Sequence, residues 1–92
     1  GLNMTVFVNI KLSAHGRSNL DEFERAVVGY PEVLECHTMA GESDYLLKVV
    51  AKDIDSYERF LRDQLLQRPH VQEAHSHIAM SEVKRTTELP LD

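Results

Sequence analysis

The chain has 92 residues, of which 42% are hydrophobic, which is enough for one modest core and too little for two independent domains. Ten Lys and Arg stand against fifteen Asp and Glu, a formal net charge of -5, so we expect no nucleic-acid binding by this chain alone. The single cysteine, Cys36, has no partner for an internal disulfide, which favours a cytoplasmic location. No apolar run reaches the ~18 residues that span a bilayer, so no membrane partner is expected.

The first predicted element is a strand over residues 5–12, in which apolar and polar side chains alternate. Its buried face is predicted to consist of Val6, Val8, Ile10 and Leu12. A helix should follow, with Ser18 or Asn19 as its N-cap. Gly29, in left-handed backbone, and Pro31 should end that helix. Its apolar face is predicted to consist of Leu20, Phe23, Val27 and Tyr30.

Two further strands are predicted over residues 33–39 and 44–51, joined by a polar turn around Gly41 into a hairpin. In the second of them Tyr45, Leu47, Val49 and Ala51 alternate with Asp44, Leu46, Lys48 and Val50. A second helix should begin at a cap formed by Asp53 or Asp55 and end at Pro69. Its apolar residues are Ile54, Tyr57, Phe60 or Leu61, and Leu65. The last strand is predicted from residue 71 to about residue 83.

This order of elements is the split βαβ pattern of a ferredoxin-like sandwich. The predicted fold class is therefore α+β, βαββαβ, with a four-stranded antiparallel sheet and two helices on one face. The other face is left open, and its apolar groups are expected to be Phe7, Leu34 or Met39, Leu46 or Tyr45, and Ile78 or Met80. An exposed apolar patch usually marks an interface, so we expect homodimers that pack through their sheet faces.

The histidines raise the question of a metal site, because His75 and His77 share one face of the last predicted strand. A third ligand would have to come from His37 or Glu35, and nothing in the sequence requires it. Cys36 and His37 are neighbours on a strand and point to opposite faces, so they do not form a nucleophile and base pair. Glycine-rich phosphate-binding motifs are also missing. We therefore expect no enzyme activity, no catalytic residue, no metal and no cofactor.

The turn between the two middle strands carries the strongest functional signal. Gly41 exposes backbone N–H groups beside the carboxylates of Glu42 and Asp44, an arrangement that suits a small zwitterion. Two acids at a hydrated turn are also common turn formers, so this pattern alone leaves both interpretations open.

A family resemblance favours the functional interpretation. The segment Met39-Ala40-Gly41-Glu42-Ser43-Asp44-Tyr45-Leu46-Leu47, the helix after it, Pro69-His70-Val71, and Lys84 together resemble the Lrp/AsnC family of feast/famine transcription regulators. The resemblance implies an effector-binding and oligomerisation domain over residues 5–84, preceded by a linker remnant at residues 1–4 and followed by a tail at residues 85–92. It also implies a separate helix-turn-helix domain that binds DNA and is missing here. We expect a fragment of a longer protein or, with Met4 as initiator, a stand-alone domain.

The resemblance further implies homodimers that assemble into an octamer-like ring and bind a small amino acid between dimers. Its ligand-binding positions fall on Met39, Gly41, Glu42, Ser43, Asp44, Tyr45, Ser76 and Ile78. The turn N–H groups would bind the α-carboxylate, Asp44 the ammonium group, and Ser76 would add a hydroxyl contact. The alternatives are a small dimeric α+β barrel enzyme acting on a small acid or aromatic substrate, with His75, His77 and Asp44 as acid and base groups, and a domain that only oligomerises.

Overall fold

The computed structural model describes residues 3–90, so the ends of the predicted linker and tail, at 1–2 and 91–92, lie outside the described residues. The elements follow the predicted order. They are β1 (Met4–Leu12), α1 (Arg17–Val28), β2 (Val33–Thr38), β3 (Tyr45–Ala51), α2 (Ile54–Asp63), the short 3-10 turn η1 (Leu65–Gln67) and β4 (Val71–Ile78). The predicted domain limits, 1–4, 5–84 and 85–92, stay a prediction.

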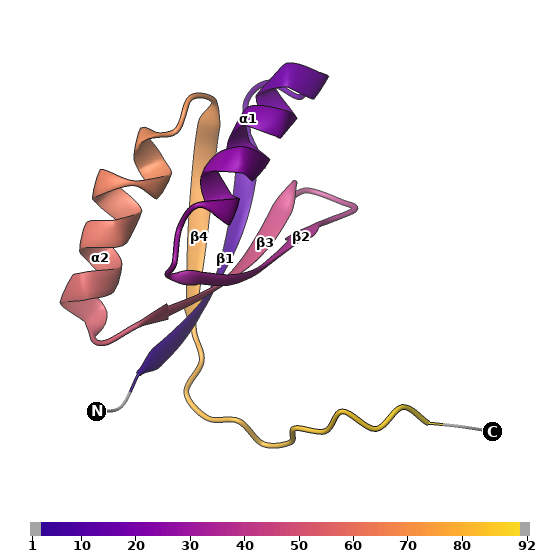
Figure 1. The fold of residues 1–92 in the computed structure, drawn as a ribbon, viewed down its shortest axis with the longest axis vertical. Coiled ribbons are helices and arrows are strands. Elements are labelled where there is room, and N and C mark those ends of the chain that lie inside the picture. The colour runs from indigo at the N-terminus through magenta and orange to yellow at the C-terminus, as the bar shows by residue number, and fades with distance from the viewer. Residues whose placement is uncertain (1–2, 91–92) are drawn as a thin grey trace.

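The strands form an antiparallel sheet in the order β2-β3-β1-β4, with four strands in the described part of the chain. Both α1 and α2 lie on one face of this sheet, and the chain after β4 runs away from the body (Figure 1). The predicted ferredoxin-like α+β fold is thereby confirmed. Because β1 and β3 are antiparallel, the end of β1 lies beside the start of β3, with Ile10 opposite Tyr45.

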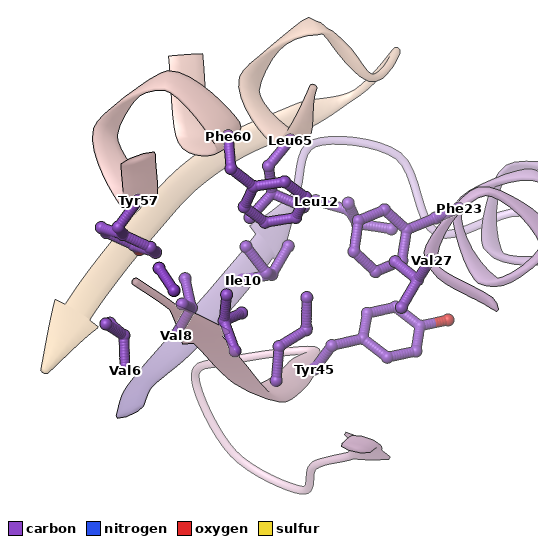
Figure 2. Packing of buried hydrophobic residues seen from close by; sticks show 13 residues of the cluster. Val6, Val8, Ile10, Leu12, Phe23, Val27, Tyr45, Tyr57, Phe60 and Leu65 are labelled. Carbon is purple, nitrogen blue, oxygen red and sulfur yellow. The ribbon is translucent and has the colours of Figure 1, made fainter. Parts of the chain in front are cut away.

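The core lies between the sheet and the helices, and period-two alternation builds its sheet side. The predicted buried face of β1 is confirmed, and the alternate residues of β3 from Tyr45 to Ala51 are buried with it. Figure 2 shows the helices closing over this surface, with Phe23 and Val27 from α1 and Tyr57 and Phe60 from α2. Leu65 completes the core from η1, beyond the end of α2.

Several predicted helix and strand ends were wrong. The N-cap of α1 is Gly16, without a side-chain hydrogen bond, because the helix begins earlier than Ser18 and Asn19 would place it. Gly29 caps the helix in right-handed backbone, with φ -82°, so its left-handed freedom is not used. The predicted cap Asp53 is confirmed in α2, but that helix ends at Asp63 and passes into η1 ahead of Pro69.

The last strand is also shorter than predicted, since β4 ends at Ile78. Its register with β1 places Ser76 opposite Val8 and Ile78 opposite Val6, on the side of the sheet that carries the helices. His75 and His77 share one face, as predicted from their spacing, and that face is the open side of the sheet.

The open face of the sheet is less apolar than expected. The apolar side chains of β1 and β3 on this face are Phe7, Leu46 and Val50, and all three are partly buried. Tyr45 faces the helices and is 2% exposed, so the choice between Leu46 and Tyr45 falls on Leu46. Leu34 and Met39 line hollows beside α1 on the other side. The expectation for Ile78 or Met80 was wrong as well, because Ile78 lies opposite Val6 on the helix side and Met80 lies beyond the end of β4. The open face is completed by polar side chains, among them Lys11, Lys48, Glu35, Glu73, His37, His75 and His77.

Within residues 3–90, no helix has the length and apolar character needed to cross a membrane. The cytoplasmic location stays a prediction.

Candidate functional site

The turn between β2 and β3 is held to the end of β1 by its backbone. Met39 N–H donates to the carbonyl of Asp44 at 2.9 Å, and Asp44 N–H donates to the carbonyl of Ile10 at 2.8 Å. Gly41 has φ +112°, in the region that favours glycine, and a side chain there would meet no atom within 4 Å. Glycine is therefore required at this position by the backbone and not by crowding.

Asp44 is the fixed charge of the turn. Its Oδ2 atom accepts a hydrogen bond from Leu12 N–H at 2.7 Å and lies 3.1 Å from Nε2 of His15. The side chain is 24% exposed, so the carboxylate is reachable from solvent although its orientation is fixed by the end of β1. Asp44 has a structural role in this position, and it also presents a negative charge to the hollow beside it.

That hollow lies between the turn and the start of α1 and has a volume of about 370 Å³. Its lining combines charges of both signs with apolar side chains. The lining residues are His15, Arg17, Leu20, Glu24, Thr38, Met39, Asp44 and Tyr45. A concave surface with a few convergent polar groups and an apolar wall is the usual form of a small-molecule site, and opposite charges suit a zwitterion.

Tyr45 joins this hollow to the core. Its ring lies 4.8 Å from the ring of Phe23, centroid to centroid, and its hydroxyl donates to the Glu24 carboxylate at 2.5 Å. Burial, together with the adjacent carboxylate of Glu24, raises the pKa of Tyr45 well above its usual range. The hydroxyl therefore remains a hydrogen-bond donor at neutral pH.

The predicted site residues do not all meet in one chain. Met39, Asp44 and Tyr45 line the hollow, whereas Gly41, Glu42 and Ser43 form the turn itself. On β4, the hydroxyl of Ser76 is hydrogen-bonded to that of Tyr57 beneath α2. Ile78 lies opposite Val6, and Val6 is four residues from Ile10, roughly 13 Å along β1 at ~3.3 Å per residue. The structure thus separates Ser76 and Ile78 from the turn.

Five lining residues were missed in the sequence, namely His15, Arg17, Leu20, Glu24 and Thr38. A usable signal was present, because His15 and Arg17 lie in the polar break after the first strand. In an antiparallel sheet of this order, that break must lie beside the turn that precedes β3.

The histidines of the open face pair with carboxylates. Nε2 of His37 lies 3.1 Å from Glu35, and Nε2 of His75 lies 3.2 Å from Glu73. Among residues 3–90, no group of three or more His, Cys, Asp or Glu side chains is arranged to hold a metal ion. Cys36 is exposed on β2.

Comparison with known proteins gives this geometry a context. The family model of the Lrp/AsnC ligand binding domain matches residues 5–89. The transcriptional regulator AzlB of Bacillus subtilis is 39% identical over 92 residues, which is 100% of this chain and 59% of AzlB. The leucine-responsive regulatory protein of Escherichia coli is 34% identical over 87 residues, 95% of this chain and 53% of that protein.

Solved structures agree with the sequence comparison. A transcriptional regulator from Neisseria meningitidis, crystallised as a complex with L-Met, superposes with a TM-score of 0.89 at 34% identity, over 97% of this chain and 57% of that one. An AsnC family regulator from Agrobacterium tumefaciens gives a TM-score of 0.84 at 39% identity, over 96% and 57% of the two chains.

The chain thus spans little more than half the length of these relatives. They are transcriptional regulators and not enzymes, so the alternative of a small barrel enzyme is set aside. With the family model matched over nearly its whole length, this chain belongs to the Lrp/AsnC family of transcriptional regulators, as its ligand-binding domain.

Proposed function

We propose that this domain senses a small amino acid and couples its binding to the assembly of a regulator that reaches DNA through another domain. The observation that carries the proposal is the hollow at the β2-β3 turn, where acidic, basic and apolar side chains converge. The relative from Neisseria meningitidis was crystallised with L-Met, a ligand of this chemical class.

The lining suggests how an amino acid would lie. The carboxylate of Asp44 would pair with the ammonium group, and Arg17 together with turn N–H groups would attract the α-carboxylate. Leu20 and Met39 would contact an apolar side chain of the ligand. In this arrangement Asp44 keeps its predicted role, and Arg17 joins the turn N–H groups as a partner of the ligand's α-carboxylate.

The remaining predicted positions, Ser76 and Ile78, would come from a neighbouring copy. Within one chain they lie away from the turn, so a site that contains them needs a second molecule. We accordingly propose homodimers that form a ring of the octamer type, with the amino acid bound between dimers. Ligand would then favour one assembly by its different affinity for the two states.

Thermal unfolding in the presence of each protein amino acid, with L-methionine first, tests the sensing role. A ligand at one hundred times its Kd should raise the free energy of unfolding by about 2.7 kcal/mol. The variant Asp44→Asn should lose most of this increase. Asparagine keeps an oxygen that accepts from Leu12 N–H, so the loss would report the missing charge rather than a broken turn.

Glu58→Gln is the matched control, because Glu58 is an exposed acid on α2 that does not line the hollow. It should retain the response. If no amino acid raised the unfolding temperature, or if Asp44→Asn responded as fully as the unsubstituted domain, the sensing role would be wrong.

A further inference from the structure

Asp44 already has a basic partner within its own chain. The Oδ2 atom that lies 3.1 Å from Nε2 of His15 also accepts the hydrogen bond from Leu12 N–H. The Leu12 contact fixes the carboxylate against the end of β1, so the carboxylate cannot turn toward a new cation without giving up a backbone hydrogen bond. A ligand ammonium and the His15 imidazole would therefore meet at the same group.

The charged surroundings of His15 come from several elements. Asp44 faces it from the turn before β3, while Arg17 and Glu24 line the same hollow from α1. Arg17 has its own partner in Asp21, at 3.8 Å, and Glu24 accepts from the Tyr45 hydroxyl. The β2 residue in the lining is the uncharged Thr38.

The other residues near the segment between β1 and α1 do not compete with His15 for Asp44. His70, in the segment before β4, uses its backbone carbonyl to accept from Ser13 N–H at 2.7 Å. Arginine keeps its charge throughout the accessible pH range, so Arg17 does not change its attraction as pH varies near neutrality. Imidazole is the side chain that gains charge between about pH 5 and 8.

Resting on the proposed function, we infer that His15 competes with the ammonium group of an amino acid for Asp44, so that the site binds amino acids more weakly as the pH falls. A protonated imidazole forms a stronger, charge-assisted hydrogen bond to the carboxylate than a neutral one. A ligand ammonium must share the carboxylate with the imidazolium or displace it, and below neutral pH either outcome costs more. The domain would thus report the amino acid and the acidity of its surroundings together.

Calorimetric titration of the domain with L-methionine, and then with the other protein amino acids, at pH 8.0 and pH 5.5 tests the inference. Imidazole gains its charge between about pH 5 and 8, so competition from the protonated form should weaken ligand binding as the pH falls across this range. We expect the Kd of the unsubstituted domain to be about ten times higher at pH 5.5 than at pH 8.0. His15→Gln should reduce this ratio to below about two.

His37→Gln is the matched control, since His37 lies at the same 3.1 Å from a carboxylate but on the open face of the sheet. It should keep the tenfold ratio. Circular dichroism at both pH values would establish that each variant is folded. The measured quantity is the ratio of Kd values, so a general weakening in His15→Gln does not affect the conclusion.

Two results would overturn the inference while leaving the proposed function intact. One is amino-acid binding with the same Kd at both pH values. The other is a pH dependence that persists in His15→Gln or disappears in His37→Gln. Failure of every amino acid to bind at either pH would instead overturn the proposed function, and the competition with it.

Discussion

Tyr45 connects the core and the candidate site through a single side chain. Its ring is 2% exposed against Phe23, while its hydroxyl reaches Glu24 in the wall of the hollow. Because burial raises the pKa of Tyr45, the folded state holds the phenol proton more tightly than the unfolded chain does. The stability that the Tyr45 hydroxyl contributes is then fully present below about pH 10, the pKa of an unfolded tyrosine, and this contribution falls as the pH rises above that value.

Tyr45→Phe tests this balance. At pH 7 the variant should lose about 1 kcal/mol of unfolding free energy, the usual worth of one hydrogen bond. Above pH 10 phenylalanine has no proton to lose, so the gap to the unsubstituted domain should narrow. Urea unfolding between pH 7 and 11 measures both effects, and a gap that stays constant across this range would contradict the assignment. Tyr30→Phe, whose hydroxyl lies 3.5 Å from the carbonyl of Gln64, serves as the control.

At the residue scale, the sequence predicted the turn better than its surroundings. Gly41 and Asp44 were recognised because a glycine turn with acids has local chemistry that can be seen in the sequence. His15 was missed because its contact with Asp44 joins residues 29 positions apart. The two residues come together only because β1 pairs with β3. That pairing follows from the order of the elements and is not visible in the local sequence around His15.

The elements themselves were predictable where one face is buried. In β1 and β3 the alternation of apolar and polar residues fixes both the strand and its buried face. In β2 the pattern is weak, since most of the strand is exposed and its pairing with β3 is irregular between Val33 and Glu35. Helix ends were less predictable, because several polar residues near α1 are equally able to cap it and the helix uses Gly16 instead.

The start of α2 is set by one side chain, the N-cap Asp53. Asp53 accepts from Ser56 N–H at 2.8 Å, and this backbone hydrogen bond is the main cause that lowers the pKa of Asp53. A lowered pKa means that the cap contributes stability above about pH 3.9, the pKa of an unfolded aspartate. The contribution is lost as the pH falls below that value.

Asp53→Ala should therefore lower the melting temperature at pH 7, because the first turn of α2 loses its acceptor. Asp53→Asn should keep most of the melting temperature, since asparagine also caps helices. The difference between Asp53→Ala and the unsubstituted domain should shrink below pH 3.9. Thermal unfolding followed by circular dichroism at pH 7 and pH 3 measures it, and equal melting temperatures at pH 7 would rule out the cap as a contributor.

At the scale of the whole molecule, the open face of the sheet is the surface that a second copy would cover. Helices α1 and α2 cover one face of the sheet only (Figure 1). The other face carries Phe7, Leu46 and Val50 among charged residues and histidines. The predicted homodimer would bury these three side chains. The sequence overestimated their number, because Tyr45, Leu34 and Met39 turn toward α1.

Leu46→Glu tests whether this face forms the dimer. Leu46 lies opposite Asn9 on one side and His37 on the other, on the open face, so a dimer that packs through this face would bury the new carboxylate at a large desolvation cost. Sedimentation at micromolar concentration should show a dimer for the unsubstituted domain and a monomer for Leu46→Glu. Val28→Glu, at an 88% exposed position on α1, should leave the dimer unchanged.

The same variants separate the dimer from the amino-acid site. If Ser76 and Ile78 reach the turn from a neighbouring copy, a monomeric Leu46→Glu that remains folded should bind L-methionine more weakly, although the hollow at Asp44 is untouched. A monomer that binds with undiminished affinity would show that one chain holds the complete site. A Leu46→Glu protein that stays dimeric would move the interface to another surface. The edge strands β2 and β4 are then the next places to test, because within residues 3–90 each has one edge without a partner strand.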